Sequence, residues 1–493
     1  MQHDLAAPFG GARARRALLL VLFLLAVALR LPGVGSAPID GHHVRQADTA
    51  SMARVMAREG VSLWTPRIGW AGPAAGAVEA EFPIYPAMVG AGWGLLGAQP
   101  PWLPRALSVL AWIVGGLALW RIVRRRFPGM PSALLVGLYA LSPLAVLVSR
   151  SIQPDALAVA LLVLAWERAD AARDAERPTA RLLLAGALLG VAIAAKGPVA
   201  LWLPVVAFAA WSALERVPSR VALAALGLAV GLPAVWYVHA HQLGADGASF
   251  KLWGSDSGKW SSLGALSQPA LWRAALAALL SQTLTPLGVG LVAAGAVGAR
   301  ANDELRPPLL GVVAGGTALV LLLPAIAVHD YYLLPLVPFA SVVAGAGAVW
   351  LWREAALGGT PAARVVGAVV LGGLLVSTGQ RSVRYLLWGG APDARIVAVA
   401  EAAREVLPAG TATVVVDRHP QTLLYALDQR GWHRATVTAA SVQELRTWGA
   451  EAMLITDTSS AYADEDFVLA LLAAHPMVAR GDGWTVVRLD VSQ

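Results

Sequence analysis

A short polar segment that follows an apolar stretch carries the residues best suited to chemistry. Residues 40–48 read DGHHVRQAD, and the apolar run before them covers residues 17–29. Ionisable groups at a bilayer boundary are costly to place, so they usually mark a functional site. A carboxylate, two imidazoles and a guanidinium this close together can deprotonate a hydroxyl, bind a metal ion or hold a phosphate. The candidate site residues of this segment are Asp40, His42, His43, Arg45 and Gln46.

Several of these residues also have a purely structural interpretation. Asp40 could cap the helix that follows it, and Arg45 could be a solvated loop charge. A divalent metal could be held by Asp40, His42 and His43 together with Glu81. Two adjacent histidine side chains point apart in most conformations, so we expect that no metal is required. We expect Asp40 to act in catalysis, because basic residues and further carboxylates accompany it.

Further polar residues lie between the other apolar stretches. Glu79 and Glu81, in the run VEAEFPIYP over residues 78–86, lie two apart, so an extended segment would place them on one face. Lys196 is one of only three lysines among 38 basic residues. This rarity favours a role in phosphate binding. The alternative is an interfacial lysine that extends its ammonium to the water layer. The remaining candidates are Arg150, Asp155, His329, Tyr331 and Tyr332. The two tyrosines could equally belong to an interfacial aromatic belt.

The composition is that of a polytopic α-helical membrane protein. Hydrophobic residues make up 57% of the chain, charged residues only 14%, and the mean hydropathy is +0.61. A soluble domain carries roughly 25% charged residues, and apolar runs of helix length recur here as far as residue 380. The net charge of +7 comes from arginine clusters typical of cytoplasmic loops, so we expect no nucleic-acid partner. The chain has no cysteine, which excludes disulfides and thiolate chemistry.

The arginines also predict the topology. They precede the first apolar run, which places the N-terminus in the cytoplasm and Asp40 outside. The stretch 84–98 is short and interrupted by prolines and glycines, so we expect it to lie in the outer interface without crossing. Every later arginine cluster then falls on the cytoplasmic side, and the candidate residues share the outer side. The eleven expected spans are 17–31, 104–121, 130–149, 154–170, 180–195, 198–214, 221–240, 274–299, 308–328, 333–352 and 362–380.

The end of the chain has a different pattern. Strands are expected at 413–416, 453–455 and 484–488, and helices around 419–430 and 464–474. This predicts a small extracytoplasmic α/β domain over residues 385–493. The membrane domain before it covers residues 1–384, with a first outer loop at about 32–103. Asp417 follows a strand, a position where α/β folds often bind ligands. An ordinary strand-to-helix turn is the more frequent interpretation of such a residue.

Several motifs occur in the same order in the GT-C glycosyltransferases. The sequence resembles this family over about residues 15–350, and most of all the bacterial protein O-mannosyltransferase-like and aminoarabinose-transferase-like enzymes. Two features depart from the family pattern. Gly41 follows Asp40 where the family often has a second acidic residue, and Phe82 follows Glu81 where it often has Lys-Pro-Pro. The matching motifs are Asp40 after the first helix, EFPIYP at 81–86, PD at 154–155, KGP at 196–198 and HDYYLLPLVP at 329–338.

The resemblance implies a GT-C membrane enzyme of about eleven transmembrane helices. Such an enzyme moves a sugar from a polyprenyl phosphate to an acceptor hydroxyl of a glycan, lipid or protein, with inversion at the anomeric carbon. Asp40 would be the general base, and Glu81 or Asp155 would orient the acceptor or stabilise positive charge on the sugar. Lys196 and Arg45 would hold the leaving phosphate. This mechanism can run without a metal.

Two other functions stay open at this point. The chain could be a transporter or scramblase of lipid-linked sugars, or a non-catalytic subunit that binds them. Transporters usually place binding groups near the bilayer midplane and contain repeated halves, whereas the expected spans show neither interior charges nor a repeat. We expect a multi-pass protein of the bacterial inner membrane, surrounded by membrane lipids. Its active site and C-terminal domain would face the periplasm or exterior.

Overall fold

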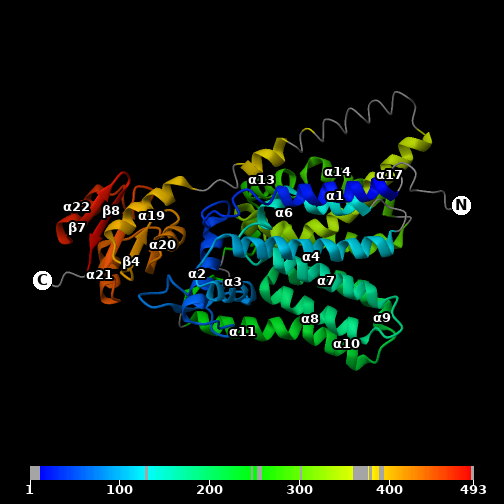
Figure 1. Ribbon diagram of the computed structural model, residues 1–493, viewed down its shortest axis with the longest axis horizontal. Helices are drawn as coiled ribbons and strands as arrows, with labels where there is room; N and C mark the ends of the chain where they lie inside the picture. The colour runs from blue at the N-terminus through cyan, green and yellow to red at the C-terminus, as the bar shows by residue number, and fades with distance from the viewer. Residues whose placement is uncertain are drawn as a thin grey trace.

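Long helices form one part of the molecule, and a sheet with covering helices forms the other (Figure 1). The computed structural model describes residues 12–127, 132–245, 248–252, 258–299, 302–358, 376, 380–387 and 393–489. Helices and strands of the first part are α1 (Ala12–Ala28), α2 (His43–Glu59), β1 (Arg67–Ile68), β2 (Gly76–Glu79), α3 (Ile84–Leu96), α4 (Trp102–Arg126), α5 (Ser132–Leu141), α6 (Pro143–Val148), α7 (Asp155–Ala172), α8 (Thr179–Ala195), η2 (Gly197–Trp202), α9 (Leu203–Leu214), α10 (Ser219–Leu226), η3 (Gly227–Gly231), α11 (Leu232–Ala245), β3 (Ala248–Ser249), α12 (Leu263–Leu266), α13 (Pro269–Ala278), η5 (Leu279–Thr283), α14 (Thr285–Gly298), η7 (Asp303–Leu305), α15 (Arg306–Leu321), α16 (Leu323–Val328), η8 (Asp330–Leu336) and α17 (Val337–Gly358).

The helical part is built to cross a membrane. Within the described residues, five helices are long and apolar enough to span a bilayer, and α13–η5 with α14 forms a sixth candidate that bends by 88°. This confirms a polytopic helical membrane protein. The expected number of eleven spans stays a prediction: span 362–380 lies almost wholly outside the described residues, and span 130–149 is divided into α5 and α6, with Pro143 opening α6. Helix α3 extends over only about 20 Å, which is too short to cross alone and agrees with an interfacial position.

The C-terminal part contains a five-stranded sheet in the order β5-β4-β6-β8-β7. Strands β5, β4 and β6 are parallel, whereas β8 and β7 run antiparallel at the other edge. One face packs on α19 and α20 and the other on α21 and α22, so strands β4, β6 and β8 are buried between the two layers of helices. This confirms the expected small α/β fold, while its boundary at residue 385 stays a prediction. The elements are α19 (Ala394–Val406), β4 (Ala412–Val416), α20 (Pro420–Leu427), β5 (Arg430–Arg434), α21 (Ala439–Thr447), β6 (Ala452–Thr456), α22 (Glu465–Ala474), β7 (Met477–Gly481) and β8 (Trp484–Arg488).

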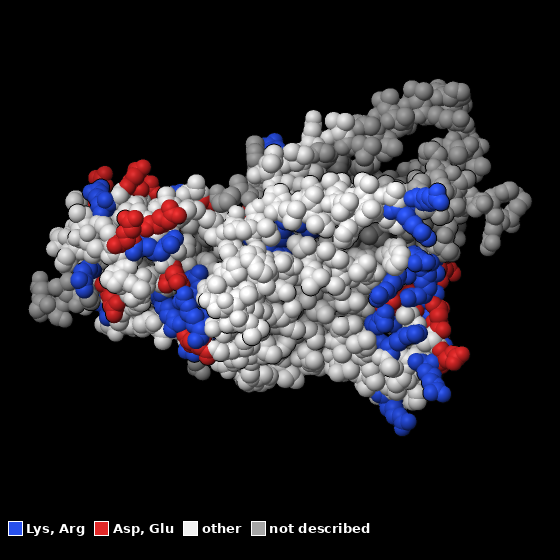
Figure 2. Space-filling model, viewed as in Figure 1, with Lys and Arg blue, Asp and Glu red and all other residues white. Residues whose placement is uncertain are grey.

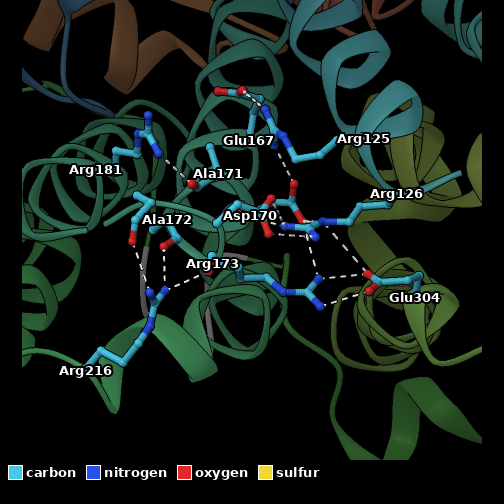
Figure 3. Close-up of polar contacts among 12 residues, drawn as sticks. Arg125, Arg126, Glu167, Asp170, Ala171, Ala172, Arg173, Arg181, Arg216 and Glu304 are labelled. Atoms are coloured by element: carbon cyan, nitrogen blue, oxygen red, sulfur yellow. Dashed lines mark hydrogen bonds and ion pairs between the residues drawn. The ribbon is translucent and has the colours of Figure 1, made fainter. Parts of the chain in front are cut away.

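Charged residues gather at the two ends of the molecule and leave an uncharged belt between them (Figure 2). At the end away from the sheet, arginines of α4 bind carboxylates of α7 (Figure 3). Arg125 contacts Glu167 at 2.9 Å and Asp170 at 2.5 Å, and Arg126 contacts Asp170 at 2.7 Å. Glu167 and Asp170 are buried, so the expectation that no span carries an interior charge was wrong at this end of α7. The network ties together helix ends that the sequence places on the arginine-rich side.

Helices α14 and α17 approach each other through glycine. A Cβ atom at Gly295 would lie 2.0 Å from the carbonyl oxygen of Val343, and one at Gly347 would lie 2.0 Å from that of Leu291. Only glycine allows backbones this close, as at many helix contacts inside membranes. The contact fixes the axial position of α17, which continues directly from η8.

Candidate active site

A lysine at the turn between α8 and η2 forms the centre of a buried ionic cluster. Lys196 Nζ lies 3.1 Å from Asp155 Oδ1 and 3.7 Å from Glu81 Oε1. The same ammonium lies over the rings of Tyr331 and Tyr332, 4.7 and 4.8 Å from their centroids. The structure therefore brings together four segments that are far apart in the sequence. Each of these five residues was a candidate, and the cluster gives them a common location.

Arg45 is the second cation of the cluster. It comes from the first turn of α2 and contacts Glu81 Oε2 at 2.7 Å. Burial would raise the pKa of Glu81, but Arg45 and Lys196 outweigh it and lower the pKa to about 2. Glu81 is thus a carboxylate at any ordinary pH and a poor proton acceptor. It holds the two cations in place.

His42 faces the same cluster from the preceding loop. Its Nε2 lies 2.7 Å from Asp330 Oδ1, and Asp330 also accepts a hydrogen bond from the Tyr385 hydroxyl at 2.7 Å. The His42 backbone is left-handed, with φ of 59°, and the ring packs edge-on against Tyr331. Burial alone would lower the pKa of His42, but the Asp330 carboxylate outweighs burial and raises it above the usual value. A neutral ring that donates from Nε2 leaves the Nδ1 lone pair free.

Three buried polar atoms on His42 and the residues of the cluster have no hydrogen-bond partner among the described residues: His42 Nδ1, Arg45 Nε and Asp155 Oδ2. Leaving such atoms unpaired is costly, and native proteins rarely do so away from functional sites. Asp155 also lines a small pocket, together with Lys196 and the two tyrosines. His42 Nδ1 and Asp155 Oδ2 can accept hydrogen bonds and Arg45 Nε can donate one, which suits a polar substrate.

Asp40, the residue expected to be the base, is bound on both carboxylate oxygens. Arg105 contacts Oδ1 at 3.0 Å and Oδ2 at 3.1 Å, and the Gln46 amide donates to Oδ1 at 2.7 Å. Arg105 is fully buried and also donates to carbonyls of the loop before Asp40, including Ser36. Arg105 was missed because it is a single charge at the start of an apolar helix. This arrangement gives Asp40 a clear structural task, and its catalytic role stays a prediction.

We expect Asp40→Asn to unfold more easily, because it leaves the buried Arg105 guanidinium without its carboxylate. Removing one partner of a buried pair costs about 3–5 kcal/mol. Thermal unfolding in detergent should show the loss, and the double variant Asp40→Asn with Arg105→Gln should lose less than the sum of the single changes. Unchanged stability with transfer reduced about 10²–10⁴-fold would instead support Asp40 as the general base.

The remaining candidates lie around the cluster but contact other groups. Gln46 joins Asp40 to the backbone of Ile152, and Arg150 donates to the Pro32 carbonyl at 2.5 Å while its Nε has no described partner. His329 stacks on the Tyr331 ring with 5.2 Å between the centroids. These residues position the loops that surround the site.

Glu79 and His43 point away from Lys196. Glu79 binds Ser249 and lies 3.5 Å from His241, so it does not share the partners of Glu81. His43 Nδ1 contacts the hydroxyl of Thr422 at 2.9 Å, which links α2 to α20 of the C-terminal part. Adjacent histidines therefore face opposite neighbours, as expected.

No three His, Cys, Asp or Glu side chains gather as a metal site within the described residues. Of the four possible metal ligands, Asp40 binds Arg105, His42 binds Asp330, His43 binds Thr422 and Glu81 binds Arg45. Their separate partners do not suit a shared ion.

Asp48 is a further group that the sequence did not single out. Its Oδ1 accepts a hydrogen bond from the Trp70 indole at 2.9 Å. Burial raises the pKa of Asp48 to about 7, although Arg45 acts in the opposite direction. It lies one helical turn after Arg45 on α2, which is the signal that could have identified it.

Known proteins share the fold of this chain, and a family model matches part of it. Residues 82–239 match the family described as dolichyl-phosphate-mannose-protein mannosyltransferase. ArnT from Cupriavidus metallidurans in the apo state superposes with a TM-score of 0.64, at 15% identity, over 97% of this chain and 100% of that chain. The chain has the GT-C fold. This confirms the resemblance inferred from the motifs.

Two further GT-C structures extend the comparison. ArnT from the same organism, bound to undecaprenyl phosphate, has a TM-score of 0.63 at 15% identity and covers 97% of this chain and 99% of its own. An Archaeoglobus fulgidus oligosaccharyltransferase tethered with an acceptor peptide has a TM-score of 0.58 at 10% identity, over 90% of this chain and 69% of that chain. No curated protein matches the sequence at a significant level. The likeness at these identities concerns the fold.

Proposed function

We propose that this protein is an inverting glycosyltransferase that moves a sugar from a polyprenyl phosphate to an acceptor hydroxyl. The observation that carries the proposal is the Lys196 cluster with its three unpartnered polar atoms, His42 Nδ1, Arg45 Nε and Asp155 Oδ2. Support also comes from the GT-C fold and from the undecaprenyl phosphate bound by one ArnT structure. We propose further that the protein lies in the bacterial inner membrane with the site and C-terminal domain facing outward.

Arg45 and Lys196 are the proposed binding groups for the donor phosphate. A phosphate that leaves the sugar gains negative charge, and fixed cations stabilise this charge most strongly where water is excluded. Arg45 keeps a free Nε–H for a phosphate oxygen while its other end binds Glu81. Glu81 prevents the two cations from repelling each other before the donor arrives.

His42 is the proposed general base, with Asp330 as its orienting partner. The acceptor hydroxyl gives its proton to Nδ1, its oxygen bonds to the anomeric carbon, and the bond from that carbon to the phosphate oxygen breaks with its electron pair. Asp330 stabilises the imidazolium that forms, in the manner of other base–carboxylate pairs. Asp155 Oδ2 is the proposed acceptor for a sugar hydroxyl or a developing positive charge. Asp40 then shapes the loop that presents His42.

The direct test uses the full chain reconstituted in lipid vesicles with a panel of labelled polyprenyl-phosphate sugars and extracted envelope acceptors. We expect the sugar to move to an acceptor with inverted anomeric configuration, while polyprenyl phosphate is released. Movement of an intact donor between leaflets would identify a scramblase. A donor that is bound but never cleaved, with every acceptor, would identify a binding subunit.

A further inference from the structure

A groove on the membrane-spanning surface ends at a buried arginine. It has a volume of about 250 Å³ and is formed by α1, α4 and α5. Its lining is apolar, with side chains such as Phe23, Trp112 and Trp120, and Arg30 is the charged residue that borders it. On the face that carries α1 and α4, Figure 2 shows basic atoms recessed within the uncharged belt.

Arg30 lacks the partners that a buried guanidinium needs. The residue is only 3% exposed. Its Nε donates to the Ser149 hydroxyl at 2.6 Å and its Nη1 to the Ala26 carbonyl at 2.7 Å. Its Nη2 has no partner, and no carboxylate of the described segments forms an ion pair with it. Two other arginines of this region are buried: Arg105 is paired with Asp40, and Arg150 donates to the Pro32 carbonyl.

An unpaired guanidinium in this position destabilises the protein unless an anion joins it. A buried charge without a counter-charge costs several kcal/mol. Neutral acceptors satisfy two of the donors of Arg30 but leave its charge uncompensated. The partner must therefore carry a negative charge and reach the guanidinium from an apolar groove.

We propose that the groove binds one anionic phospholipid, with an acyl chain along the groove and the phosphodiester on Arg30. A phosphodiester carries one negative charge, which matches one uncompensated guanidinium, and its oxygens accept from N–H donors. The groove lies beside exposed apolar side chains of α1, such as Leu20 and Leu24, so a lipid can enter from the bilayer. This site is distinct from the Lys196 cluster, and its test requires no transferase activity.

Native mass spectrometry of the detergent-solubilised full chain tests the site, with phosphatidylglycerol as the probe and phosphatidylcholine as the neutral comparison. We expect the wild type to retain one phosphatidylglycerol, and Arg30→Gln to bind it roughly 10- to 100-fold more weakly. Ala140→Phe, which fills the groove but keeps Arg30, should also weaken binding. The matched control Arg306→Gln removes an exposed arginine and should bind like the wild type.

Three results would overturn the proposal. Arg30→Gln could bind phosphatidylglycerol as tightly as the wild type, or the wild type could bind phosphatidylcholine equally well. A clear preference for undecaprenyl phosphate over phosphatidylglycerol would show that the groove takes a different lipid. Circular dichroism of each variant shows whether it is folded. If Arg30→Gln does not fold, the binding measured with Ala140→Phe still tests the proposal.

Discussion

Replacing Lys196 with methionine is expected to reduce sugar transfer by about 10²–10³-fold, the usual effect of removing one group that stabilises a developing negative charge. Donor binding should weaken by roughly 10- to 100-fold, since a hydrogen bond to a charged group contributes about 1.5–3 kcal/mol. Both losses have the same cause: Lys196 is the cation that lies beside Asp155 and Glu81 and over the rings of the two tyrosines. Binding of a polyprenyl-phosphate sugar, followed by the transfer rate, measures the two effects separately.

Lys251→Met is the matched control, because it removes another of the three lysines from an exposed position. It should bind and transfer like the wild type. Lys196→Arg keeps the positive charge on a side chain of different shape. Its affinity for the donor should therefore fall less than that of Lys196→Met. If Lys196→Met binds the donor with wild-type affinity, the phosphate site lies elsewhere.

His42→Gln is expected to reduce transfer by about 10²–10⁴-fold and to change its pH dependence. A general base works only when deprotonated, so wild-type activity should fall as the pH drops through the pKa of His42. Asp330 holds this pKa above the usual 6.5, so the decline should begin on the alkaline side of that value. The acidic limb should disappear in His42→Gln, whose residual activity has no base that titrates there. Transfer rates measured across the pH range with saturating donor test this expectation.

The neighbouring histidine supplies the control. Burial lowers the pKa of His43 to about 4, and its ring faces Thr422. His43→Gln should therefore keep the acidic limb of the profile. An unchanged limb in His42→Gln would exclude His42 as the base.

Much of the fold follows from local patterns in the sequence. The strands expected at 413–416, 453–455 and 484–488 correspond to β4, β6 and β8, because buried runs rich in Val and Ile are unambiguous. Strands β5 and β7 were missed: β5 carries Arg430 and His433, and β7 is mostly exposed at the sheet edge. Their strand conformation is determined by pairing with their neighbours, which the local sequence does not express.

The sequence predicted that the polar candidates lie at one boundary of the helical bundle, where they have few possible neighbours other than each other. These candidates include Glu81, Asp155, Lys196 and Tyr331. The sequence did not predict which side chain contacts which. His42 and Asp330 are 288 residues apart, and nothing in the spacing says that these two loops touch. Asp40 was given the leading role because basic residues and further carboxylates accompany it, whereas the structure adds the buried Arg105.

The close contact at Gly295 and Gly347 has a consequence for genetics. Gly347 is 16 residues after Tyr331 in the continuous stretch of η8 and α17, a distance on the order of 25 Å. A methyl group at Gly347 would press on the Leu291 carbonyl and force α17 to slide or tilt. Tyr331 belongs to the same continuous segment and would move with α17. In a screen for loss of sugar transfer, Gly347→Ala would therefore have the phenotype of an active-site mutation, although Gly347 itself does not contact the substrate. Suppressors of such an allele should map to α14.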